Sequence, residues 1–235
     1  MEIRYLYHSG FAVDTGGHLL IFDFFKDTPR GGKLADGVID PAEIFGRDVV
    51  VFASHSHGDH YSPAVFGWRK QLPRVRYVLA DDIRTREEAY RVGPGETLDL
   101  GDLSVRTLRS TDEGVAFLVK TDGLTVYHAG DLNWWHWNSE TDAYNAQMAR
   151  DYRREIDSLR GESIDAAFLP VDPRLEDKYL WGIDYFMRTV GAELAVPMHL
   201  WERYELIGRL RAEEQATPYR DRVAGYSQRG ELVAP

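Results

Sequence analysis

The chain has 235 residues, of which 43% are hydrophobic, enough to bury the core of one large domain, and no linker-like segment divides it, so we expect one domain over residues 1–235. Its 28 basic and 38 acidic residues give a net charge of −10, which argues against a general nucleic-acid-binding protein. It contains no cysteine, which excludes disulfides and thiolate metal ligands. No apolar run resembles a signal peptide or a membrane span, so we expect a cytoplasmic location and no membrane association.

The first half of the chain is typical of β-strands separated by turns. Alternating apolar residues on both sides of the Gly16-Gly17 turn predict a β-hairpin at the start. Ser62-Pro63 is a good helix start and predicts a helix over 62–72, and a short charged helical segment is expected around 85–90. The predicted strands cover 3–7, 11–15, 18–24, 48–54, 77–80, 97–100, 103–109, 115–120 and 124–129.

From Asp142 onward the pattern changes to helical. Met148, Tyr152 and Ile156 recur at helical spacing, and Gly161 ends the run. Strands predicted at 165–171 and 193–198 then alternate with helices predicted around 183–190 and 206–210. Two mixed β-blocks with helices outside them predict an α/β protein, a four-layer αββα sandwich.

The densest group of metal-binding residue types is the loop after the predicted strand 48–54. Its sequence is His-Ser-His-Gly-Asp-His, with potential ligands at His55, His57, Asp59 and His60. Loops between a strand and a helix are where α/β sheets usually carry their chemistry. Imidazole ligands suit zinc, iron, nickel and copper, and the carboxylate keeps manganese open.

Two later strands end in further ligand-type residues. The segment LTVYHAGD places Asp131 just after an apolar strand, and AVPMH places His199 at the end of another. Either residue alone is more often a structural cap than a ligand. Because both follow strands, as the histidine loop does, we expect the three elements to converge on one metal site.

The chain resembles a metallo-β-lactamase superfamily hydrolase over nearly its whole length. The resemblance extends to the branch of small metal-dependent hydrolases that includes the ascorbate-6-phosphate lactonases. The matching residues are His55, His57, Asp59 and His60, Asp131 in HAGD, His199 in PMH, the opening YHSGF, and FDF at Phe22-Asp23-Phe24.

The resemblance implies a role for each of these ligands. His55 and His57 would bind a first metal, Asp59, His60 and His199 a second, and Asp131 would bridge the two. The resemblance also implies a metal-bound hydroxide as nucleophile, with Asp59 and Asp131 as catalytic carboxylates able to accept or return a proton. Self-association of the chain is a further expectation.

One ligand of the family pattern is missing, since no histidine lies between His60 and His128 to complete the first site. Asp112 or Glu113 is one candidate replacement, His8 or His136 is another, and a weak or empty first site is the third alternative. The cofactor is therefore one or two divalent transition metals. Zinc is favoured, and a carboxylate replacement would shift the preference toward manganese or iron.

Two segments are candidate substrate contacts. The segment NWWHWN follows Asp131 directly, and Trp134, Trp135 and His136 either form a wall of the substrate pocket or pack in the core or a subunit contact. Arg174 either binds an anionic substrate group or forms a surface salt bridge with Asp172 or nearby acids.

These observations predict a metal-dependent hydrolase that acts on a small anionic molecule such as a lactone, a phosphodiester or a related ester. One alternative is a nuclease of the same fold, which the acidic charge disfavours. Another is a metal-binding or sensing module with little or no turnover, which the missing histidine favours. We expect a small-molecule substrate and no nucleic-acid partner.

Overall fold

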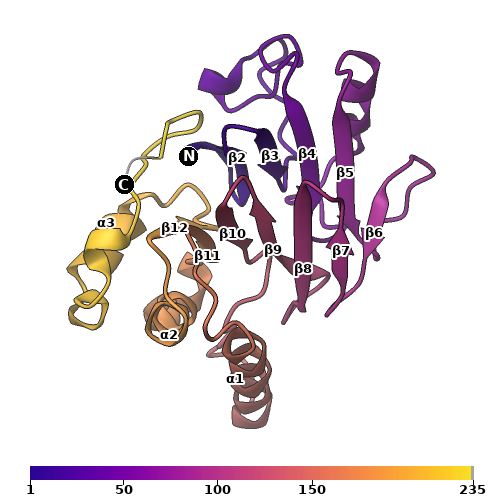
Figure 1. Ribbon diagram of the computed structural model, residues 1–235. Helices are drawn as coiled ribbons and strands as arrows, with labels where there is room; N and C mark the ends of the chain where they lie inside the picture. The colour runs from indigo at the N-terminus through magenta and orange to yellow at the C-terminus, as the bar shows by residue number, and fades with distance from the viewer. Residues whose placement is uncertain (234–235) are drawn as a thin grey trace.

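The computed structural model describes residues 1–233 and contains two six-stranded β-sheets (Figure 1). In the first sheet, β1, β2 and β3 form an antiparallel meander, which confirms the predicted hairpin, and β3 to β6 run parallel. The strands are adjacent in chain order: β1 (Glu2–Tyr7), β2 (Gly10–Asp14), β3 (His18–Phe22), β4 (Asp48–Ala53), β5 (Val75–Ala80) and β6 (Tyr90–Val92).

The second sheet contains the other six strands, again adjacent in chain order. Strands β7 to β10 are antiparallel and β10 to β12 are parallel. They are β7 (Thr97–Asp99), β8 (Leu103–Arg109), β9 (Val115–Thr121), β10 (Leu124–His128), β11 (Ala166–Pro170) and β12 (Leu194–Met198). Each predicted strand of this half is present, with its ends shifted by at most a few residues.

Buried aromatic rings hold the two sheets together. Phe11 meets Phe168 at a ring distance of 4.6 Å, and Phe52 meets Phe117 at 5.3 Å, each pair joining one sheet to the other. All four rings are fully buried, and complete burial of one such side chain is worth roughly 1.5–3 kcal/mol. This core fixes the strand ends of one sheet relative to those of the other.

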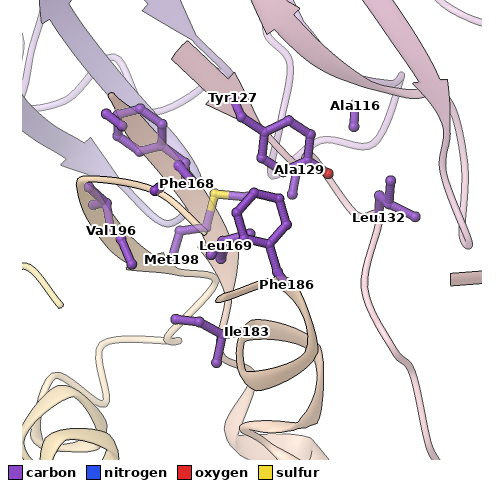
Figure 2. Packing of buried hydrophobic residues seen from close by; sticks show 14 of the residues in the cluster. Ala116, Tyr127, Ala129, Leu132, Phe168, Leu169, Ile183, Phe186, Val196 and Met198 are labelled. Carbon is purple, nitrogen blue, oxygen red and sulfur yellow. The ribbon is translucent and has the colours of Figure 1, made fainter. Parts of the chain in front are cut away.

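Three α-helices cover the second sheet and its edge: α1 (Asp142–Asp157), α2 (Trp181–Thr189) and α3 (Glu205–Ala212) (Figure 1). Figure 2 shows Phe186 of α2 against Tyr127 of β10, and their rings stack at 5.0 Å. The side chain of Thr141 caps α1 by accepting a hydrogen bond from the Tyr144 amide. Within residues 1–233, none of the helices combines the length and apolar character needed to cross a bilayer.

The outer face of the first sheet is covered by a 3-10 helix, η2 (Pro63–Lys70), and by loops rather than by an α-helix. Ser62 caps η2 as predicted, and Val65, Phe66 and Trp68 pack onto the sheet. The structure therefore has two sheets between two outer layers, as predicted. The remaining 3-10 turns are η1 (Leu34–Asp36), η3 (Pro173–Lys178), η4 (Glu214–Ala216) and η5 (Arg220–Arg222).

The helical segment predicted around Thr85 to Tyr90 is wrong. These residues form no helix, and β6 begins at Tyr90. The Thr85 hydroxyl accepts a hydrogen bond from the Glu87 amide, which closes a local turn, and Tyr90 pairs with Val78 of β5. The segment has no apolar face to bury, so pairing with the sheet decides its conformation.

Candidate metal centre

The predicted ligands meet where strands of the two sheets end. The histidine loop follows β4, Asp131 follows β10 and His199 follows β12. These strands belong to the parallel parts of their sheets, where strand ends gather along one edge. His55, His60 and His199 are buried, and Asp131 is 5% exposed.

Three imidazoles point at the Asp131 carboxylate. The Nε2 atoms of His60 and His199 lie 3.3 and 3.5 Å from its Oδ1 atom, and the Nε2 atom of His55 lies 3.6 Å from its Oδ2 atom. Among the described residues, Asp131 Oδ1 and His60 Nε2 are buried and have no hydrogen-bond partner. Buried polar atoms without partners are costly, and a divalent cation would satisfy both. The donor set therefore fits a metal.

Each of these histidines is held by a second contact on its other ring nitrogen. The Nδ1 atom of His60 donates to Asp23, and that of His199 donates to Asp172, both at 2.8 Å. The Nδ1 atom of His55 lies 3.0 Å from the hydroxyl of Ser54, which itself donates to Asp23 at 2.7 Å. Because Nδ1 is engaged in each ring, Nε2 is the nitrogen that each histidine can offer to a metal, as in known metal sites.

Beside His55, a second histidine and a carboxylate extend the group. The Nδ1 atom of His57 lies 3.0 Å from the Nε2 atom of His55. Ligand atoms of His57, Asp112 and Asp131 lie within 4.8 Å of one another. Glu113 also approaches His57, with its Oε2 atom 3.5 Å from Nε2, but it lies outside that group. Of the two candidate carboxylates, Asp112 is thus the one that lies near both His57 and Asp131.

Gly114 brings the Asp112 turn onto the metal loop. It has a φ of +68°, and a Cβ atom there would lie 1.9 Å from the Ser54 carbonyl oxygen and 2.6 Å from the Cβ of His55. Its amide-linked neighbour Val115 donates to the same Ser54 carbonyl. Only glycine allows both this conformation and this close approach.

His8 joins the other side of the centre. Its Nε2 atom lies 3.6 Å from the Asp59 carboxylate, and ligand atoms of His8, Asp59, His60 and His199 lie within 4.8 Å of one another. The sequence offered His8 as a replacement at the first site, but the structure places it with the ligands expected for the second. His136 joins neither group, because its ring packs against Trp181 at 4.8 Å.

The electrostatics favour bound cations. Burial would raise the pKa of Asp131, but His60, His199 and His55 hold it below its ordinary value. Burial, together with His199 and His60, lowers the pKa of His8 to about 2, so this imidazole is neutral and able to bind a metal. Burial also opposes charge on His60, yet the Asp131 and Asp23 carboxylates raise its pKa to about 9. The same negative potential that favours a proton on His60 would attract a metal cation, which would replace that proton.

Several residues around the centre have a strained backbone. The φ angles are +55° at His8, +43° at Asp23 and +63° at His199, and those at Trp201 and Glu202 are also positive. Non-glycine residues seldom adopt this region, and such strain concentrates at functional sites. Positive φ values at His8 and at His199 thus agree with the placement of the site.

A cavity of about 140 Å³ lies beside Asp131. Two of the predicted substrate contacts, Trp135 and Arg174, line it. The Trp135 indole donates to the Asp131 carbonyl at 2.9 Å. Arg174 pairs with Asp172 at 2.6 Å, so it forms the expected salt bridge and also faces the cavity. The other lining residues are Thr111, Asp112, Trp137, Tyr144 and Met148.

The other two predicted substrate contacts are not among the residues that line this cavity. Trp134 packs against Trp181 at 5.4 Å with the Arg153 guanidinium over its ring, and His136 lies against the same Trp181. Sequence reasoning missed Trp137 and Tyr144, although Trp137 belongs to the same tryptophan-rich segment.

Curated relatives of this chain are described as metal-dependent hydrolases. A UPF0173 metal-dependent hydrolase from Alkaliphilus metalliredigens is 24% identical over 219 residues, which is 85% of either chain. Another, from Opitutus terrae, is 28% identical over 224 residues, which is 85% of this chain and 84% of the relative.

Solved structures show the same fold at low sequence identity. Igni18, a metallo hydrolase from Ignicoccus hospitalis, has a TM-score of 0.63 and 20% identity, and the match covers 99% of this chain and 97% of that one. The metallo-beta-lactamase fold protein YhfI from Bacillus subtilis has a TM-score of 0.60 and 14% identity over 98% of each chain. The family profile described as the beta-lactamase superfamily domain matches residues 2–145, more than half of the chain. This chain therefore belongs to the beta-lactamase superfamily and has the metallo-β-lactamase fold.

Proposed function

We propose that this protein is a metal-dependent hydrolase that acts on a small anionic molecule. The observation that carries the proposal is the convergence of three buried imidazole Nε2 atoms on Asp131, whose Oδ1 atom has no hydrogen-bond partner among residues 1–233. The relatives described as metal-dependent hydrolases support the same reaction class.

Two groups of residues would hold the metal. His57, Asp112 and Asp131 would form the first group, and His8, Asp59, His60 and His199 the second. His55 lies beside both, 3.0 Å from His57 and grouped with His60 and Asp131, and we assign it to the first. Zinc suits the histidines, and the carboxylate of Asp112 shifts the preference toward manganese or iron. When bound, such a metal acidifies water to near neutral pH and polarises the bond under attack.

The protein residues would orient the ligands and carry the protons. Asp23 and Asp172 hold the rings of His60 and His199, and this orientation is set before substrate binds. The Asp59 side chain is 36% exposed at the mouth of the centre, where it can take up a proton and release it to solvent. Asp131 is more deeply buried, and its lowered pKa keeps it ionised as a ligand.

Arg174 is the candidate anion contact. It faces the cavity beside Asp131, and its guanidinium also lies 5.6 Å from the Trp137 ring and 5.0 Å from the Trp201 ring. Asp172 and the two rings fix its position, so it can contact a phosphate or carboxylate near the metal without reorganising. A lactone, a phosphodiester or a related ester with a nearby negative charge suits this arrangement.

A substrate panel tests the proposal. The protein, loaded separately with zinc, manganese and iron, would be assayed with γ-butyrolactone, p-nitrophenyl acetate, bis-p-nitrophenyl phosphate and a short RNA. We expect metal-dependent hydrolysis of at least one small substrate, lost in Asp131→Ala. Cleavage of the RNA alone would favour a nuclease, and inactivity on every substrate with every metal would favour a binding module without turnover.

A further inference from the structure

A larger cavity adjoins the one beside Asp131. The outer cavity has a volume of about 400 Å³ and shares Thr111, Asp112, Tyr144 and Met148 with the inner cavity of about 140 Å³. Because four lining residues are common to both, the two cavities lie next to each other, and we call them together the groove; its inner part lies at the candidate metal centre.

The groove runs along one face of α1. Tyr144, Met148, Asp151 and Glu155 line the outer cavity and recur every three or four residues, which places them on one face of the helix. From Tyr144 to Glu155 the helix rises about 16 Å, at 1.5 Å per residue. The groove is therefore long enough for an extended chemical group.

Tyr144 and Met148 form the part of this face nearest the metal centre. Tyr144 is 43% exposed, and Met148, one turn further along α1, is 9% exposed and lines both cavities. The ring of Trp137, which also lines the inner cavity, adds a third apolar surface. The thioether of Met148 and the rings of Tyr144 and Trp137 can contact apolar groups of different shapes on a ligand.

The charges further along the groove largely compensate one another. Arg154 lies 2.7 Å from Asp151 and 3.2 Å from Glu155, and Gln147 donates to Asp151 at 2.9 Å. These carboxylates are already paired, so they offer little attraction to a second charged group on a ligand. Arg109 lines only the outer cavity, whereas Tyr144 and Met148 line both, so a group that extends from the metal centre meets the apolar surface at Tyr144 and Met148 first.

We propose that the substrate is a small anion with an apolar arm: its labile bond lies beside Asp131 and its arm lies over Tyr144 and Met148. Tyr144 and Met148 are then the residues that determine specificity for the arm. This inference rests on the proposed hydrolase function and extends it from the reacting group to the class of substrate.

Binding of alkylphosphonates tests whether the groove holds an apolar arm, and it requires no turnover. Methyl-, butyl- and octylphosphonate would be titrated by calorimetry into the zinc-loaded protein. Each buried methylene is worth up to about fourfold in affinity, so we expect octylphosphonate to bind at least tenfold more tightly than methylphosphonate. In parallel, kcat/KM would be compared for p-nitrophenyl acetate and octanoate, and for methyl and octyl p-nitrophenyl phosphate.

Variants at two tyrosines of similar exposure test whether the alkyl chain binds in the groove. Tyr144→Ala should reduce the octyl-to-methyl affinity ratio at least threefold, and Tyr144→Phe should preserve it because the hydroxyl is not required. Tyr90, in β6 and 44% exposed, is the control, and Tyr90→Ala should leave the ratio unchanged. Melting curves of all three variants would show that each is folded.

The outcomes separate this inference from the proposed function. Equal affinities for methyl- and octylphosphonate, or an equal loss in Tyr144→Ala and Tyr90→Ala, would overturn the inference even if short substrates are hydrolysed. If no substrate is hydrolysed, the proposed function fails. A Tyr144-dependent gain for octylphosphonate would in that case still support the groove as a binding site for an apolar arm.

Discussion

The Nδ1 atom of His60 lies 2.8 Å from the Oδ2 atom of Asp23, and both side chains are completely buried. Asp23 follows β3 and also accepts hydrogen bonds from the Ser54 amide and hydroxyl, at 2.8 and 2.7 Å. One carboxylate thus fixes both ends of the histidine loop. Its pKa lies below the ordinary value, because His128, His60 and His55 outweigh the effect of burial, so it stays ionised at neutral pH.

Asp23→Asn should weaken metal binding. His60 and the Ser54 hydroxyl both bond to Oδ2 of Asp23, whereas the Ser54 amide donates to Oδ1. An asparagine whose oxygen takes the Oδ2 position turns its NH2 group toward the Ser54 amide, which then loses its acceptor, so the start of the histidine loop is no longer held. Loss of such a partner typically costs 10- to 100-fold in metal affinity. Competition titration with a zinc chelator would measure the change. Asp99→Asn, at an exposed carboxylate of β7, is the control, and equal affinities of the two variants would contradict the role of Asp23.

Asp112→Ala and Glu113→Ala should differ in metal content. Asp112 lies in one group with His57 and Asp131, whereas Glu113 approaches only His57. We expect Asp112→Ala to lose about one metal per chain in elemental analysis and Glu113→Ala to lose none. The reverse result would assign Glu113 as the ligand, and full metal content in both variants would remove either carboxylate from the centre.

Gly114→Ala should destabilise the fold. The new Cβ would lie 1.9 Å from the Ser54 carbonyl oxygen, so the turn would have to move away from the metal loop. Because the clash adds to the strain of a positive φ, we expect the free energy of unfolding, measured with urea, to fall by about 2–4 kcal/mol. Gly123→Ala has a similar φ of +75° but no atom within 4 Å of the new Cβ, so its loss should be smaller. Equal losses would show that the close approach to Ser54 does not matter.

His18 should make stability depend on pH. Its Nδ1 atom lies 2.9 Å from Asp122 and its Nε2 atom 3.0 Å from Asp102, which ties β3 to two turns of the second sheet. Burial opposes charge on this ring, but the two carboxylates raise its pKa above the ordinary value. The stabilisation is therefore complete below about pH 6.5, the unfolded value, and is lost as pH rises through the folded pKa.

Unfolding of the metal-free protein and of His18→Gln between pH 5.5 and 9 would measure this contribution. We expect the difference in free energy of unfolding between the two to shrink as pH rises above 6.5. A difference that stays constant, or that grows with pH, would contradict the charged state of His18.

The sequence predicts the ligands that directly follow apolar strands. The end of a strand is visible as the end of an apolar run, and the structure brings the candidates His55, Asp131 and His199, chosen in this way, together with His60 of the same loop as His55. The role of His8 depends on how the β1–β2 turn packs against His199, and no local pattern carries that information.

The groove also lies beyond sequence reasoning. In the sequence, Tyr144 cannot be told from any other residue in the first turn of a helix. It lies near the candidate metal centre because α1 packs beside the Asp112 turn. Within the tryptophan-rich segment, the pattern could not tell Trp135, which lines the cavity, from Trp134, which packs against Trp181.

We propose that the residues around Asp131 hold two metals. Elemental analysis of protein purified without chelators, then reconstituted with zinc or with manganese, measures the number of metals per chain. We predict about two tightly held metals per chain, falling by about one in Asp112→Ala and to near zero in Asp131→Ala. One metal or none in the reconstituted wild-type protein would contradict the presence of two metal sites.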